Sequence, residues 1–183
     1  AEHRFLKMFA GDYIEAHHEA CKFVDEVYGV KIPAQADITI ASCGGYPKDI
    51  NVYQMQKTMD NAVLATKQGG VVILLAECEE GSGSKVLEET CRTLKTADAI
   101  EAKLRDRFLI GANKAYAITR LTKKAHFILV TGLDRQLAKD MLFDGAVDTV
   151  EEALELAKQY VGDDVHYILM PTGSLTVPLY RPE

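Results

Sequence analysis

Several absences narrow what this sequence can encode. It contains no tryptophan and no CxxC pair, and its four cysteines are scattered along the chain. So few cysteines exclude a disulfide scaffold, and no Cys/His cluster has the spacing of a zinc site. The longest apolar run, Val71 to Ala76, is far shorter than the ~20 residues of a membrane span, and the N-terminus lacks an apolar signal region. We therefore expect a cytoplasmic protein with free thiols and no membrane partner.

Basic charge is also scarce. The sequence has 21 Lys and Arg against 27 Asp and Glu, which gives a formal net charge of -6 at pH 7. General nucleic-acid binding needs clustered Lys and Arg, so no nucleic-acid partner is expected. The 48% hydrophobic residues are normal for a globular protein and exclude a disordered one. The 183 residues allow one domain and a piece of another, since domains cluster at roughly 100–150 residues.

Apolar runs alternate with amphipathic segments along the chain. The runs are continuous rather than alternating, which is typical of strands with both faces covered in a parallel sheet. The sequence thus predicts an α/β fold with a mostly parallel sheet of four to five strands flanked by helices, a Rossmann-like three-layer arrangement. The expected strands are 37–42, 71–76, 126–130, 165–170 and a small 146–148. The expected helices are 12–29, 52–67, 85–95, 98–107, 111–124, 135–142 and 150–160, before an extended tail at 175–180.

Ligands of open parallel sheets bind at the carboxyl ends of the strands. The loops expected there include two with paired glycines, Gly44 and Gly45 in one and Gly81 and Gly83 in the other. These four glycines are candidates for cofactor binding. Neither loop matches GxGxxG or a P-loop, and tight strand-to-helix turns explain the glycines equally well.

The helix expected from residue 52 opens with a polar cluster. Asn51 is a suitable N-cap, Tyr53 and Lys57 are four residues apart and share a face, and Gln54 lies beside them. Free N–H groups and the helix dipole attract anions at such a terminus. The cluster therefore predicts a seat for a small carboxylate. The alternative is that Gln54 completes the cap, Tyr53 packs and Lys57 is solvated.

Histidine and cysteine give weaker signals. His126 and His166 lie in expected strands and His17 adjoins His18 on a helix, so no metal-binding residue is predicted. Cys43 and Cys78 both follow strands and could serve a cysteine-nucleophile hydrolase. No partner histidine is identifiable for either, which favours bystander thiols.

Three segments together resemble one known family. Residues 37–57 read DITIASCGGYPKDINVYQMQK, residues 69–84 read GGVVILLAECEEGSGS, and residues 169–178 read LMPTGSLTVP. In this order and spacing they closely resemble the C-terminal half of the nickel-dependent lactate racemase family. The upstream AGDYIEAHHEAC at residues 10–21 is also similar to that family, just before its C-terminal domain.

The resemblance implies a two-domain enzyme with its active site between the domains. Such enzymes interconvert the enantiomers of a 2-hydroxy acid by reversible hydride transfer to a nickel pincer nucleotide. The Tyr-Gln-x-x-Lys residues of the family line the site; here they are Tyr53 and Gln54, which would orient the substrate, and Lys57, which would neutralise its charge as the catalytic residue. The nickel ligand and the acid/base histidines belong to the N-terminal domain, so this chain alone would be inactive.

The domain organisation follows from the same resemblance. We expect residues 1–33 to be a lead-in helix and linker from a missing N-terminal domain, and residues 34–183 to be the C-terminal α/β domain. The start at Ala1 without an initiator Met fits this expectation. Family members carry a tryptophan near the cofactor in this half, and its absence is consistent with a homologue acting on another 2-hydroxy acid. The alternative is a stand-alone α/β module that binds an anionic metabolite or a nucleotide phosphate.

Overall fold

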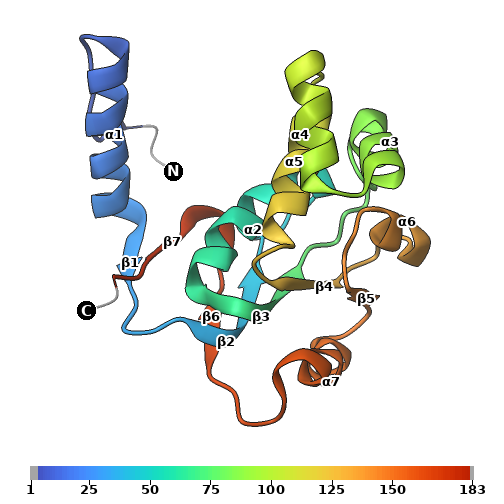
Figure 1. Ribbon diagram of the computed structural model, residues 1–183. Coiled ribbons are helices and arrows are strands. Elements are labelled where there is room, and N and C mark those ends of the chain that lie inside the picture. Colours follow the sequence, from blue (N-terminus) through green and yellow to red (C-terminus); the bar gives the residue numbers. More distant parts are fainter. Residues whose placement is uncertain (1–3, 182–183) are drawn as a thin grey trace.

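A five-stranded parallel sheet forms the centre of the computed structural model, which describes residues 4–181 (Figure 1). Its strand order is β5-β4-β3-β2-β6, and every neighbouring pair is parallel. The predicted fold class is therefore confirmed. The strands are β2 (Ala36–Ser42), β3 (Thr66–Leu75), β4 (His126–Val130), β5 (Gly145–Val147) and β6 (Tyr167–Met170).

Helices cover both faces of this sheet. Val72 and Leu74 of β3 belong to the core shared with α2, α3 and α5, whereas Val71 and Ile73 pack on the side of α7. Successive side chains of a strand point to opposite faces, so the continuous apolar runs are the consequence of two covered faces. The helices are α2 (Val52–Ala65), α3 (Lys85–Leu94), α4 (Ala97–Asp106), α5 (Ala112–Leu121), α6 (Arg135–Asp140) and α7 (Val150–Val161).

A separate helix and a small second sheet stand beside this unit. Helix α1 (Tyr13–Tyr28) begins at the N-cap Asp12, has no buried residue and projects away from the central sheet (Figure 1). It continues into β1 (Gly29–Lys31), which pairs in parallel with β7 (Val177–Leu179) after the short helix η1 (Gly173–Leu175). The extended tail is confirmed, but β1 was not predicted, because a three-residue strand is specified by its distant partner. None of the helices within residues 4–181 is long and apolar enough to cross a membrane.

The junction between α2 and β3 differs from the prediction. The helix ends at Ala65 rather than residue 67, and β3 begins at Thr66, so that Gly69 and Gly70 lie inside the strand. The buried Thr66 hydroxyl lies 2.8 Å from both the Ala62 carbonyl and the Thr39 hydroxyl, which fixes the turn without a glycine. β6 likewise starts two residues later than expected.

Candidate functional site

The N-terminus of α2 is held by the glycine loop that follows β3. The Val52 N–H donates to the Gly81 carbonyl at 3.1 Å, and the Tyr53 N–H donates to the Ser82 carbonyl at 3.0 Å. The Asn51 side chain accepts from the Gln54 N–H at 3.0 Å, which confirms the predicted cap. These three amides are engaged within the chain. The expectation of free N–H groups at this terminus is therefore wrong, and any anion seat here must be built from side chains.

The four glycines proposed for cofactor binding have two kinds of surroundings. Gly81 and Gly83 have φ of 65° and 72°, and a Cβ on Gly83 would lie 2.4 Å from Cγ of Asn51. This loop therefore packs against the cap of α2. Gly44 and Gly45, at the carboxyl end of β2, are exposed, and no atom lies within 4 Å of a Cβ built on Gly45. Of the four, Gly45 faces open space that a ligand could occupy, whereas a Cβ on Gly44 would contact Lys48 at 3.5 Å. The cofactor role of the glycines stays a prediction.

A cavity of about 370 Å³ lies beside α2, between α1, α5 and η1. Val24 and Tyr28 of α1 contribute apolar lining, while Lys57 and Asp60 of α2 and Lys114 of α5 contribute charged lining. Two lysines from different helices thus meet at one cavity. Its volume is in the range of small-ligand sites.

Neutral side chains hold both lysines in place. Lys57 Nζ donates to Gln54 Oε1 at 2.7 Å, and Lys114 Nζ donates to Gln56 Oε1 at 2.6 Å. Lys114 Nζ also lies 5.0 Å from the centroid of the Tyr53 ring, a cation–π contact. Of the three residues predicted from the sequence, Lys57 lines the cavity, while Tyr53 and Gln54 contact the two lysines.

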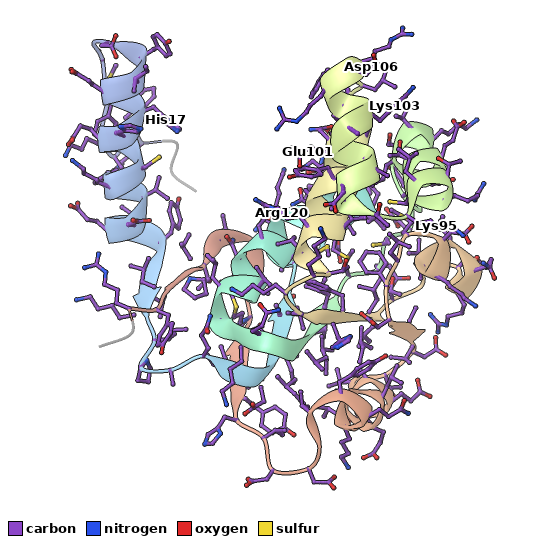
Figure 2. The ribbon with its side chains drawn as sticks, viewed as in Figure 1. His17, Lys95, Glu101, Lys103, Asp106 and Arg120 are labelled. Atoms are coloured by element: carbon purple, nitrogen blue, oxygen red, sulfur yellow. The ribbon has the colours of Figure 1, made fainter. Side chains whose placement is uncertain are left out.

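Neither lysine has an acidic partner. Within residues 4–181, no Asp or Glu forms an ion pair with Lys57 or Lys114. The nearby Asp60 accepts from the Gln56 amide and lies 3.7 Å from Arg120, which extends from α5 (Figure 2). Burial, followed by the charge of Lys57, lowers the pKa of Lys114. Asp60 offsets part of this positive charge but also faces Arg120, so the cavity keeps an excess of positive charge that favours an anionic ligand.

Sequence reasoning missed Gln56 and Lys114. Gln56 follows Tyr53 by three residues and therefore shares its helix face, a signal that was present in the spacing. Lys114 is 58 residues beyond Gln56, and nothing local to it indicates that its side chain reaches α2.

The described part of the chain does not form a metal centre by itself. No group of three His, Cys, Asp or Glu side chains within residues 4–181 could hold a metal ion. His126 Nδ1 instead lies 3.0 Å from Asp144, and His17 is on the isolated helix α1 (Figure 2). The nickel part of the cofactor implied by the resemblance therefore does not fit these residues alone.

Three of the four cysteines, including both candidate nucleophiles, are unsuited to catalysis because they are buried. Cys43, Cys78 and Cys91 are buried. Burial raises the pKa of Cys43 to about 11 and that of Cys78 to about 12. Because the thiolate is the nucleophile, this disfavours the hydrolase alternative.

Comparison with known proteins finds relatives over nearly the whole chain. A family model described as the lactate racemase C-terminal domain matches residues 31–177. A lactate racemase of Thermoanaerobacterium thermosaccharolyticum is 34% identical over 178 residues, covering 94% of this chain and 41% of the relative. A lactate racemase of Lactiplantibacillus plantarum is 31% identical over 176 residues, covering 93% and 41%. The chain thus spans about 41% of the length of these curated relatives.

Solved structures agree with the sequence comparisons. The structure of the lactate racemase apoprotein from Thermoanaerobacterium thermosaccharolyticum matches with a TM-score of 0.81 and 32% identity, covering 90% of this chain and 40% of that one. A crystal structure of a Thermotoga maritima protein matches with a TM-score of 0.60 and 13% identity, covering 90% and 42%. The second likeness concerns the fold alone.

Proposed function

The chain belongs to the lactate racemase family through the C-terminal domain, and on this premise we propose that it supplies the substrate-holding surface of a racemase. The parent protein would interconvert the enantiomers of a 2-hydroxy acid. Membership of the family supports this isomerase over a stand-alone module that binds an anionic metabolite or a nucleotide phosphate.

One observation carries the proposal: two lysines that form no ion pair with any acidic residue among residues 4–181 share one cavity beside α2. Lys57 is the more exposed of the two and would neutralise the substrate carboxylate, or the alkoxide charge that develops during reaction. Gln54 fixes the Lys57 ammonium through its hydrogen bond, and Tyr53 underlies Lys114. These contacts orient the positive charge before the substrate arrives, which lowers the cost of binding.

The cofactor part of the proposal rests on the family resemblance. We propose that the parent uses a nickel pincer nucleotide, which when bound supplies reversible acceptance of hydride. The metal ligands and the acid/base histidines would come from the N-terminal domain, the partner to which residues 1–33 would connect. In this chain, the open space at Gly45 is where a nucleotide could approach. On this proposal the isolated chain is inactive.

The test is the substitution Lys57→Ala in the full-length parent supplied with cofactor and nickel. Loss of the positive charge should lower turnover at least about tenfold, or roughly 1.4 kcal/mol of barrier. Chiral chromatography of the product over time measures the rate. Lys139→Ala on α6, away from the cavity, is the matched control and should leave turnover unchanged. A Lys57→Ala enzyme with normal kinetics would refute the assigned role.

A further inference from the structure

We propose that Lys114 is a specificity-determining residue that binds a second carboxylate, so that the preferred substrate is a 2-hydroxy dicarboxylate. This inference rests on the proposed function and narrows its substrate class.

The Lys114 side chain lies where it can contact a ligand that Lys57 also contacts. Lys114 lines the same cavity as Lys57, although the two side chains come from different helices. A 2-hydroxy monocarboxylate brings one anionic group, for which one lysine is sufficient. A second lysine at the same cavity adds a positive charge. Asp60 also lines the cavity but is shared with Arg120, so it balances this charge only in part, and a ligand with another anionic group is favoured.

The Lys114 side chain is fixed by contacts with two residues of α2. Its Nζ is fixed by Gln56 Oε1 at 2.6 Å and by the Tyr53 ring at 5.0 Å. Gln56 is only 3% exposed, and its amide nitrogen donates to Asp60. The Gln56 oxygen is thereby oriented toward the lysine. Fixing this side chain costs rotamer entropy, which the hydrogen bond and the cation–π contact offset, so the ammonium is already oriented toward the cavity when a ligand arrives.

The charges around Lys114 also favour a second anionic group on the ligand. The charged groups around Lys114 are Lys57 and Asp60 of α2, and Asp60 is already engaged by Gln56 and Arg120. The partial burial of Lys114 and its repulsion by Lys57 both oppose its charged form, and the charge of Asp60 offsets them only in part. A ligand with two carboxylates relieves both costs, because each ammonium then faces an anion.

The anion beside Lys114 has two sources to distinguish. A carboxylate of the substrate and a phosphate of a nucleotide cofactor share the chemistry that a lysine binds. Loss of a substrate contact should affect dicarboxylates selectively. Loss of a cofactor contact should lower activity on every substrate by the same factor.

The experiment compares malate and lactate as substrates of the full-length parent loaded with cofactor and nickel. In the wild type, kcat/KM should be at least about tenfold higher for malate, since a charge-assisted contact contributes roughly 1.5–3 kcal/mol. Lys114→Met keeps the length of the side chain and removes the charge. It should lower kcat/KM about tenfold for malate and less than about threefold for lactate. Lys103→Met on α4, outside the cavity lining, is the matched control (Figure 2).

Two further measurements support the kinetic comparison. Lys114→Arg keeps the charge and should retain a preference for malate, which guards against a Met variant that fails to fold. Succinate, which lacks the hydroxyl, should compete with substrate more strongly than propionate in the wild type but not in Lys114→Met.

The outcomes separate this inference from the proposed function. A parent that racemises lactate but not malate, or a Lys114→Met enzyme that loses both activities equally, overturns the dicarboxylate inference and leaves the racemase intact. A parent that racemises no 2-hydroxy acid overturns both.

Discussion

At the scale of single residues, Asp37 connects three strands. Its carboxylate accepts from Lys67 Nζ at 2.8 Å and from the His166 N–H at 3.0 Å. Lys67 is in β3 and His166 directly precedes β6, so one side chain of β2 fixes the amino ends of its two neighbours. The Lys67 hydrogen bond, followed by that of His166, holds the pKa of Asp37 below its usual value.

Asp37→Asn should lower the free energy of unfolding by about 1–2 kcal/mol at neutral pH, because charge-assisted hydrogen bonds are lost. Since the folded-state pKa is depressed, the stabilisation is complete above the unfolded pKa near ~3.9 and disappears as pH falls through the folded value. Urea unfolding of both proteins at neutral and acid pH measures this. The difference in unfolding free energy between the two proteins should vanish at acid pH. A difference that grows there would contradict a stabilising role of the Asp37 carboxylate.

Asp98→Asn is the matched control for this prediction. Asp98 also accepts from a lysine, Lys123, at 2.9 Å, but its side chain is 88% exposed. Exposed ion pairs are screened by solvent and contribute little. At each pH, the urea midpoint of Asp98→Asn should therefore stay close to that of the unsubstituted chain.

At the scale of elements, the start of α2 determines where the lysine cavity forms. The loop carbonyls of Gly81 and Ser82 take the first two amides of the helix, and Asn51 takes the third. Gly83 leaves room for the Asn51 side chain, whereas the Cβ of any other residue at this position would collide with it. The glycine loop thus positions Lys57 indirectly, by positioning the helix that carries it.

Gly83→Ala should cost about 2 kcal/mol of unfolding free energy, from the positive φ and from displacement of the cap. Gly45→Ala is a matched control, because Gly45 has the same φ of 72° but open space around it. It should cost about 1 kcal/mol, from the backbone alone. Urea unfolding monitored by circular dichroism gives both values. Equal losses would show that contact with Asn51 is unimportant.

At the scale of the whole molecule, α1 is set apart from the rest. No residue of α1 is buried, and apolar side chains such as Tyr13 and Ile14 remain 81% and 49% exposed. Its contribution to the central unit is limited to β1 and to the wall that Val24 and Tyr28 form at the cavity. The assignment of residues 1–33 to a lead-in from another domain stays a prediction.

Deletion of residues 1–28 should leave the α/β unit folded, with an unfolding free energy within about 1 kcal/mol of the intact chain, because little apolar surface is lost. Urea unfolding and a dispersed amide NMR spectrum test this. As a contrast, Ala153→Asp in α7 places a charge at a fully buried site and should unfold the chain. A truncated chain that is unfolded would show that α1 is part of the same folding unit.

Much of the fold was determined by the sequence alone. Continuous apolar runs such as 71–76 and 126–130 predicted parallel strands, and Asn51 predicted the start of α2, because hydrophobic periodicity and capping act over a few residues. The motif around Tyr53, Gln54 and Lys57 indicated both a helix face and a family.

Which side chains meet at the site depends on tertiary packing. Lys114 reaches Gln56 across 58 residues, and the Asp37 carboxylate reaches His166 across 129. The same long-range packing engaged the amides of α2, which local reasoning left free for an anion. Partners so far apart in the chain leave no periodic or capping signal in either segment. Local sequence could therefore specify the elements, while the second lysine of the cavity became visible only when α2 and α5 were packed together.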